Sequence, residues 1–253
     1  MILEKMDSAM QLTSNPYVAV YMITYNQDKY IRLAIESIMQ QKTNFPVKLF
    51  IGDDASSDQT QNICAELMLK YPDKIEPCFQ KINIGATNNA ILTFKKCISS
   101  GAKYIALCEG DDYWTNPLKL QKQVDFLETH KEYNGVFHKV SLLNNSTNEF
   151  SECVLNINTP DSIEVGDLLK KNIIRTCSIV LRTESVTPLF TNDQFVNIYK
   201  KATPGDWLIF IFAIRNKKMK YFSENMAVYR IHDGGMWSEA KDIELKYARE
   251  IFN

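Results

Sequence analysis

The residues best suited to chemistry in this sequence are three neighbouring carboxylates, Glu109, Asp111 and Asp112. They follow residues 104–108, a mostly apolar run that predicts a buried strand. Burying several carboxylates without a partner is costly, and Mg2+ or Mn2+ prefers oxygen ligands that it shares with substrate phosphates. The pattern therefore favours a site for a divalent metal and a diphosphate. A helix cap beside a solvated loop would give the same letters, so both interpretations stand at this point.

The composition is that of an ordinary globular protein and argues against several functional classes of protein. The chain has 253 residues, of which 45% are hydrophobic, and a net charge of -1, which gives no electrostatic basis for binding nucleic acid. No run of about 18 apolar residues occurs, so we expect no transmembrane segment. Residues 1–15 lack the pattern of a secretory signal, and the six cysteines lack C-x-x-C spacing. We expect a cytoplasmic protein, with peripheral contact at the inner face of the membrane left open.

Apolar runs alternate with amphipathic segments along the first 142 residues. The predicted strands are the apolar runs at residues 18–23, 47–51, 75–79, 104–108 and 135–142. The segments between them predict helices, and Pro77 indicates an edge position or a bulge for the third strand. Ser56 and Gln59 predict a capping box before the second helix. The alternation indicates an α/β fold with a mostly parallel sheet, helices on both faces, and ligand-binding loops at the carboxyl ends of the strands.

The later part of the chain is less regular. We expect a loop or hairpin at residues 143–161, a strand at 176–182, helical segments at 183–190 and 207–214, a strand at 226–231, and a helix from about residue 238. No linker separates these segments from the first 142 residues. The sequence therefore predicts one continuous fold with a smaller carboxyl-terminal portion.

Six stretches of this sequence, taken together, resemble the family 2 glycosyltransferases of bacterial type, which have the Rossmann-like GT-A fold. They are residues 20–26, 51–58, 83–85, 109–112, 205–207 and 229–232, and their order and spacing carry the resemblance. It implies an inverting, metal-dependent transferase that uses Mn2+ or Mg2+. The implied donor is a nucleotide-diphosphate sugar, with a UDP-sugar as first choice. The implied acceptor is a hydroxyl of a glycan or lipid-linked oligosaccharide in polysaccharide biosynthesis.

The resemblance also divides the chain. Residues 1–15 would be an N-terminal extension, residues 16–142 the nucleotide-sugar-binding half, and residues 143–253 the acceptor-binding half of the same domain. A continuation beyond Asn253 is left open. Acceptor loops vary most among such enzymes, so the second half carries the weaker expectations.

The implied nucleotide-binding residues come from both halves of the chain. They are Thr24, Tyr25, Asn26, Asp54, Asn83, Gly85, Asn88, Glu109, Asp111 and Arg230. Tyr25 can stack on a flat base, and the resemblance gives Asp54 the uracil N3–H as its partner. Asn88 stands at or near the position where the family has an arginine, which is a departure from the pattern. Asp53 is expected to turn inward, and Asp58 is interpreted as a structural residue near a helix start.

The implied metal ligands are Asp111 and Asp112, with His232 completing the shell. Asp206 is the implied catalytic base, which would deprotonate the acceptor hydroxyl for a single in-line attack and so give inversion. The pair is Gly-Asp here, where the family often has Glu-Asp. A plain helix cap is the alternative interpretation of Asp206. Trp207 offers a sugar-stacking face for the acceptor, and core packing is an equal alternative.

Three other functions can be compared with the same sequence motifs. Residues 52–58 resemble an acidic motif of haloacid dehalogenase phosphatases, but the loop after the first strand lacks their Asp-x-Asp nucleophile. A sugar nucleotidylyltransferase needs a glycine-rich basic loop there, and residues 24–28 contain no glycine. A catalytically inactive module that binds sugar nucleotide or glycan stays open as the alternative function. Retention of three acids at the expected positions favours the enzyme.

Overall fold

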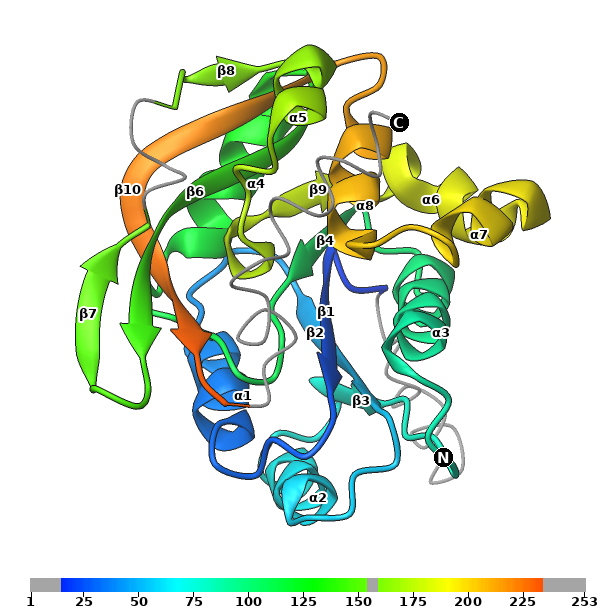
Figure 1. Cartoon of the computed structure of the whole chain (residues 1–253), viewed down its shortest axis with the longest axis vertical. Helices are drawn as coiled ribbons and strands as arrows, with labels where there is room; N and C mark the ends of the chain where they lie inside the picture. The colour runs from blue at the N-terminus through cyan, green and yellow to red at the C-terminus, as the bar shows by residue number, and fades with distance from the viewer. Residues whose placement is uncertain (1–14, 154–158, 234–253) are drawn as a thin grey trace, which may run out of the picture.

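The computed structural model describes residues 15–153 and 159–233, which form a ten-stranded mixed sheet with helices packed on it (Figure 1). The strands are β1 Val18–Thr24, β2 Val47–Asp53, β3 Ile75–Pro77, β4 Tyr104–Leu107, β5 Tyr113–Trp114, β6 Tyr133–Asn144, β7 Glu149–Glu152, β8 Ser162–Ile163, β9 Val180–Arg182 and β10 Lys218–Ile231. The helices are α1 Ile31–Met39, α2 Thr60–Lys70, α3 Ala86–Ser99, α4 Lys119–Thr129, α5 Val165–Lys170, α6 Thr183–Thr191, α7 Asp193–Tyr199 and α8 Gly205–Ala213. A 3-10 turn, η3, covers Thr176–Ser178.

The amino-terminal part of the sheet has the predicted parallel order. Strands β3, β2, β1 and β4 lie side by side and run in parallel. Strand β1 is an unbroken apolar segment and is almost fully buried, as expected for a strand covered on both faces. Strand β9 then pairs antiparallel with both β4 and β6, and β10 runs parallel to β6. The predicted α/β fold class is confirmed, and β9 makes the complete sheet mixed.

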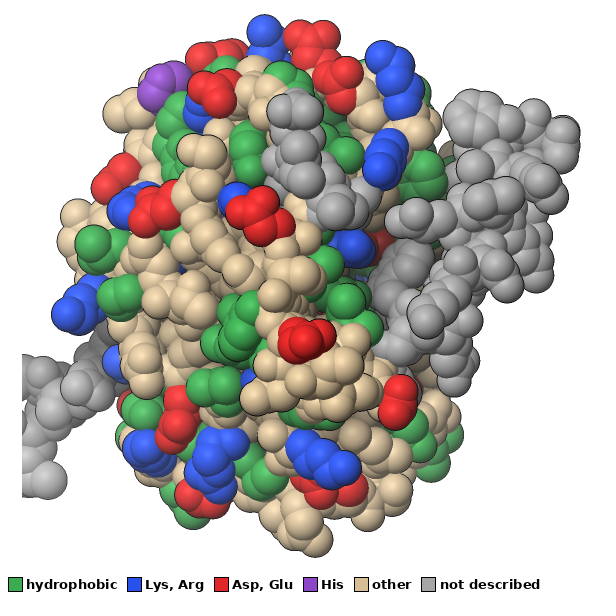
Figure 2. Space-filling model, turned by 60° about the vertical axis from the view of Figure 1, so that its left-hand side comes forward, with side chains coloured by type: hydrophobic (Ala, Val, Ile, Leu, Met, Phe, Trp, Pro, Cys, Tyr) green, Lys and Arg blue, Asp and Glu red, His purple; other side chains and the backbone are tan. Residues whose placement is uncertain are grey.

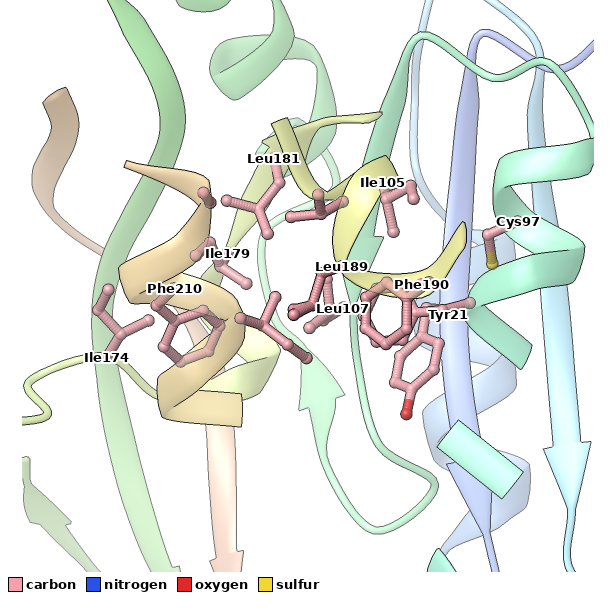
Figure 3. Packing of buried hydrophobic residues seen from close by; sticks show 14 of the residues in the cluster. Tyr21, Cys97, Ile105, Leu107, Ile174, Ile179, Leu181, Leu189, Phe190 and Phe210 are labelled. Carbon is pink, nitrogen blue, oxygen red and sulfur yellow. The ribbon is translucent and has the colours of Figure 1, made fainter. Parts of the chain in front are cut away.

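Two hydrophobic clusters, one on each face of the sheet, hold the helices in place. On one face Tyr21 stacks on Phe94 of α3 with 4.1 Å between ring centroids, and Phe94 stacks on Phe190 of α6 at 4.2 Å. Phe210 of α8 belongs to the same cluster (Figure 3). On the other face Met22 packs in the cluster that α1, α2 and α4 share. Alternate residues of β1 thus serve opposite faces, and α8 is anchored through the same core as β1.

The predicted strand at residues 176–182 is wrong in its first half. Residues Thr176–Ser178 form the η3 turn, in which the Ser178 N–H donates to the Arg175 carbonyl oxygen at 2.9 Å. Only Val180–Arg182 pairs with neighbouring strands. An apolar run has the same appearance in a strand and in a tight turn next to one, so periodicity does not separate the two.

The capping box predicted for Ser56 and Gln59 does not form. Ser56 Oγ instead donates to Asp53 Oδ2 at 2.5 Å, and Asp58 Oδ1 accepts the Thr60 N–H at 2.9 Å at the start of α2. Carboxylates are stronger acceptors than a hydroxyl, and two of them lie within reach of these donors. The inward orientation of Asp53 and the structural role of Asp58 are confirmed.

Other expectations can be checked against the described residues. Strand β3 lies at an edge, one of the two positions that Pro77 indicated, and residues 143–161 include the β6–β7 hairpin. None of the described helices is long and apolar enough to cross a bilayer. The helix expected from about residue 238 lies outside the described residues. Acidic and basic side chains are interspersed over the face shown in Figure 2, in keeping with the small net charge.

Candidate active site

The carboxyl ends of β1, β2 and β4 lie at one edge of the sheet, where three loops meet. Thr24 pairs with Asp53 at the ends of β1 and β2. Just beyond, the Asp54 N–H donates to the Thr24 carbonyl oxygen at 3.1 Å, and the Gly110 N–H donates to the Ile23 carbonyl oxygen at 3.1 Å. The loops that carry the predicted base-binding residues and the acids are therefore joined through their main chains.

Gly110 allows the acidic loop to lie close against the loop after β1. A Cβ at this position would lie 2.4 Å from Gln27 Oε1, 2.8 Å from Thr24 Oγ1 and 2.9 Å from Ile31 Cδ1. These separations are shorter than van der Waals contact, so a larger residue would require the side chains of Gln27, Thr24 and Ile31 to shift. The glycine between the acids is thus explained by close packing.

Asp54 and Asn26 connect the predicted nucleotide-binding segments. Asp54 is 3% exposed, and its Oδ1 accepts the Ile84 N–H at 2.8 Å, which brings the turn before α3 to the end of β2. Asn26 adopts a left-handed backbone with φ 52, and its Oδ1 accepts the Ser57 N–H at 2.9 Å. Asparagine tolerates this conformation better than most residues. Both side chains therefore hold neighbouring loops together, in addition to any contact with a ligand.

Tyr25, Asn83 and Asn88 lie at the outer edge of this wall. The Tyr25 side chain is 48% exposed, which leaves its ring accessible to a base. Asn83 Oδ1 accepts the Gly85 N–H at 3.1 Å, and Asn88 Nδ2 donates to the Ile84 carbonyl oxygen at 2.8 Å. The two asparagines thus stabilise the turn before α3. Their predicted contact with the nucleotide stays a prediction.

The three predicted acids do form a cluster. Glu109, Asp111 and Asp112 each offer an oxygen within 4.8 Å of the others. Asp112 Oδ1 accepts the Arg230 N–H at 2.9 Å, whereas its Oδ2 is buried and receives no N–H or O–H hydrogen bond from the described residues. Three carboxylates with oxygens at this spacing fit a hard divalent cation such as Mn2+ or Mg2+.

The end of β10 closes one side of the acid cluster. His232 Nε2 lies 3.0 Å from Asp111 Oδ2, and this hydrogen bond is the main reason that the pKa of His232 is raised. The His232 ring lies 4.6 Å from the Tyr30 ring. The Arg230 guanidinium lies over the rings of Tyr30 and Tyr113, at 5.1 Å and 4.9 Å. His232 and Arg230 thus both contact the acids, while their predicted roles toward a metal and a phosphate stay predictions.

The acid cluster is electrostatically unfavourable for anions. Burial, and then the charges of Asp111, Asp112 and Asp206, raise the pKa of Glu109 well above its usual range. Burial and the charge of Asp111 raise the pKa of Asp112 in the same way, and Arg230 only partly opposes this. A bound cation would offset this repulsion and stabilise the ionised forms of the carboxylates.

Asp206 faces the same site from α8. It lies in the first turn of the helix, where its Oδ1 accepts the Trp207 N–H at 2.8 Å. Burial raises the pKa of Asp206, while Arg175 and a hydrogen bond with Thr176 act in the opposite direction. The charge of Asp206 acts on Glu109, so the two carboxylates share one environment. Asp206 is thus a half-buried carboxylate whose charge acts on the acid cluster.

Two neighbours of Asp206 depart from simple expectation. Pro204 occupies the helix N-cap, so the cap interpretation of Asp206 does not describe its position. A Cβ on Gly205 would lie 3.0 Å from Tyr199 Oη, so a glycine there lets Tyr199 pack closely against the start of α8. Trp207 Nε1 donates to the Leu168 carbonyl oxygen at 2.7 Å, which ties the indole to α5. Contact of Trp207 with an acceptor stays a prediction.

Sequence reasoning missed Arg175 and Tyr229 as part of this site. The Arg175 guanidinium lies 4.9 Å from the Tyr229 ring centroid. Burial and the charges of Asp112 and Glu109 raise the pKa of Tyr229 well above its usual range, which places its hydroxyl near the acids. Tyr229 begins one of the stretches that carry the resemblance, and that was a usable signal. No local motif marks Arg175.

Comparison with known structures identifies the class of fold. S. aureus TarS 1-349 in complex with UDP-GlcNAc superposes with a TM-score of 0.66 at 20% identity, over 88% of this chain and 61% of that chain. The mannosyltransferase PcManGT from Pyrobaculum calidifontis, in complex with GDP-Man and Mn2+, superposes with a TM-score of 0.59 at 15% identity, over 95% of this chain and 66% of that chain. The chain therefore has the GT-A fold of glycosyltransferases.

Sequence comparison supplies the family. The model described as "Glycosyl transferase family 2" matches residues 19–183, which is more than half of the chain. The protein Rv1520 of Mycobacterium tuberculosis, described as uncharacterized, is 36% identical over 224 residues, which are 88% of this chain and 61% of that protein. The chain thus spans about three fifths of the length of this relative. It belongs to glycosyl transferase family 2.

Proposed function

We propose that this chain carries the active site of an inverting, metal-dependent glycosyltransferase. It would transfer a sugar from a UDP-sugar to a hydroxyl of a glycan or lipid-linked oligosaccharide in polysaccharide biosynthesis. The observation that carries this proposal is the cluster of Glu109, Asp111 and Asp112, with ligand oxygens within 4.8 Å of one another, together with the charge of Asp206, which acts on Glu109. A site for a metal-bound diphosphate next to a lone base is the minimum that such a reaction requires.

The chemistry assigned to Asp206 is proton removal. The acceptor hydroxyl forms a bond to the anomeric carbon of the donor while the bond from that carbon to the diphosphate oxygen breaks. The hydroxyl proton passes to an Asp206 carboxylate oxygen, and UDP leaves from the opposite face, so the configuration inverts. Burial raises the pKa of Asp206, which makes its ionised form a stronger base than a solvated aspartate.

The donor side is assigned to the loops after β1, β2 and β4. Asp54 would accept the uracil N3–H, Tyr25 would stack on the base, and Glu109 would reach the ribose hydroxyls. Asp111, Asp112 and His232 would hold the cation. A bound Mn2+ or Mg2+ would act as a Lewis acid that neutralises the charge developing on the diphosphate. The complexes of TarS with UDP-GlcNAc and of PcManGT with Mn2+ support a nucleotide-sugar donor and a divalent ion.

The acceptor side is assigned to residues 143–253, with residues 16–142 forming the nucleotide-sugar-binding half. Trp207 lies next to Asp206 at the start of α8, which supports a role close to the acceptor. We infer a cytoplasmic enzyme whose acceptor is presented at the inner face of the membrane when it is lipid-linked.

A panel of sugar nucleotides with Mn2+ tests the proposal. Thermal unfolding is recorded with UDP-glucose, UDP-galactose, UDP-GlcNAc and GDP-mannose, and the donor that binds is then assayed for UDP or GDP release. A true donor raises the unfolding temperature by mass action, and chelation of the metal should abolish most of the shift. A chain that binds none of the four, or binds one without releasing nucleotide in the presence of polyol acceptors, is not this enzyme. Binding without release would establish the inactive-module alternative.

A further inference from the structure

Two arginines reach the proposed active site, and they act on opposite ends of it. Arg230, at the end of β10, donates its N–H to Asp112 Oδ1 at 2.9 Å and its charge opposes the raised pKa of Asp112. Arg175 lies directly before η3, and its charge instead opposes the raised pKa of Asp206. The acid cluster and the proposed base thus each have a cation of their own.

The surroundings of Arg175 do not use its hydrogen-bonding capacity fully. The guanidinium lies 4.9 Å from the Tyr229 ring centroid and is mostly buried. Its Nε is buried without a hydrogen-bond partner, while another part of the guanidinium hydrogen-bonds the Cys153 side chain. A buried N–H without an acceptor is unfavourable. Such an arrangement is expected where a ligand accepts hydrogen bonds from the arginine.

The position of Arg175 indicates which part of the donor it meets. The diphosphate belongs at the acid cluster, and the nucleoside belongs at the loops after β1 and β2. Asp206 must lie next to the hydroxyl that attacks the anomeric carbon, so the sugar ring occupies the space between Asp206 and the acids. Arg175 is the cation at the Asp206 end of that space. A guanidinium presents parallel N–H groups that match a pair of adjacent oxygens, as neighbouring sugar hydroxyls provide.

We propose that Arg175 binds the transferred sugar, with its guanidinium donating hydrogen bonds to hydroxyl oxygens of the ring. This inference rests on the proposed function and adds the residue that recognises the sugar rather than the nucleotide. The guanidinium lies over the Tyr229 ring, which restricts the positions it can take and so the sugar hydroxyls that can be bound. Arg175 is thereby a specificity-determining residue for the donor.

The test compares UDP with the UDP-sugar that gives the largest thermal shift, by calorimetry in the presence of Mn2+. For Arg175→Gln we expect UDP affinity within about twofold of wild type and UDP-sugar affinity roughly ten- to hundredfold weaker, as for loss of hydrogen bonds to a charged group. Arg230→Gln should weaken both ligands in parallel. Arg32→Gln, on the exposed side of α1, is the control outside the site.

Arg175→Lys separates charge from hydrogen-bond geometry. It keeps a cation next to Asp206 but loses the parallel N–H groups, so UDP-sugar affinity should stay weakened while the unfolding temperature stays close to that of wild type. Equal weakening of UDP and UDP-sugar in both Arg175 variants, or no weakening in either, overturns the inference while leaving the proposed function standing. If the wild-type chain binds UDP but no UDP-sugar, the proposed function and this inference both fail.

Discussion

Replacing Asp206 by asparagine tests the proposed base with little disturbance of the fold. Asp206 Oδ1 accepts the Trp207 N–H at 2.8 Å, and an asparagine oxygen can accept the same hydrogen bond, so α8 should begin as before. The amide cannot take a proton from an acceptor hydroxyl. General base catalysis contributes roughly 10²- to 10⁴-fold in rate, which corresponds to about 3–5 kcal/mol of barrier. We therefore expect the turnover of Asp206→Asn to be lower than that of wild type by at least about 10²-fold.

The assay is UDP release from the donor found in the panel, with water or a sugar acceptor, together with calorimetric UDP binding in Mn2+. UDP affinity should be nearly unchanged, because the nucleotide is held by other residues. Asp193→Asn is a matched control, since Asp193 lies in the first turn of α7 and is exposed. It should keep full turnover.

Stability and pH provide independent checks on Asp206. Burial raises the pKa of Asp206, so the ionised form opposes folding at pH values above that pKa. Asp206→Asn removes this charge, and its unfolding temperature at pH 8 should equal or exceed that of wild type. Wild-type turnover should rise as pH rises through the raised pKa of Asp206. Turnover of Asp206→Asn within threefold of wild type would refute the assignment of the base.

Three further predictions follow from the contacts described above. Asp111→Asn removes a proposed metal ligand and should weaken Mn2+-dependent UDP binding at least about tenfold, with metal-free binding unchanged, as calorimetry would measure. Gly110→Ala should lower stability by about 1–3 kcal/mol, because its Cβ meets atoms at 2.4–2.9 Å, whereas Gly166→Ala meets no atom within 4 Å and should not lower it. Urea unfolding measures the difference, and equal stability of the two variants would contradict the packing argument. Glu128 is partly buried, which opposes ionisation, but hydrogen bonds from Lys103 and two tyrosines lower its pKa to about 2. Its stabilising effect should be complete above the unfolded pKa of 4.5 and lost as pH falls toward 2, so Glu128→Gln should be less stable by about 1 kcal/mol at pH 7, and equally stable near pH 2.

Much of the first half could be predicted from local patterns. The continuous apolar run of β1 predicts that this strand is buried. The proline in β3 is compatible with an edge position, where the strand lies. Asp53 is fully buried at the end of β2, as expected, whereas Asp54 was singled out by the family resemblance, and its contact with a base stays a prediction. The acids of the cluster could be placed together because the strand before them ends at a known edge of the sheet.

The parts that could not be predicted depend on contacts between distant segments. His232 and Asp111 are 121 residues apart in sequence, and only the family resemblance linked them before their contact at 3.0 Å was seen. Arg175 lies over the Tyr229 ring only after η3 and β10 have packed together, and its charge acts on Asp206 from a separate segment of the chain. The length of η3 was misjudged because an apolar turn and an apolar strand share the same composition.

A crystal structure with UDP and Mn2+, with the metal located by anomalous scattering, tests the central claim most directly. We predict one anomalous peak bound by an Asp111 carboxylate oxygen, bridged to the diphosphate, with the uracil next to Asp54. The space between the diphosphate and Asp206 should be large enough for a sugar ring. A peak away from Glu109, Asp111 and Asp112, or a diphosphate bound elsewhere on the chain, would contradict the account.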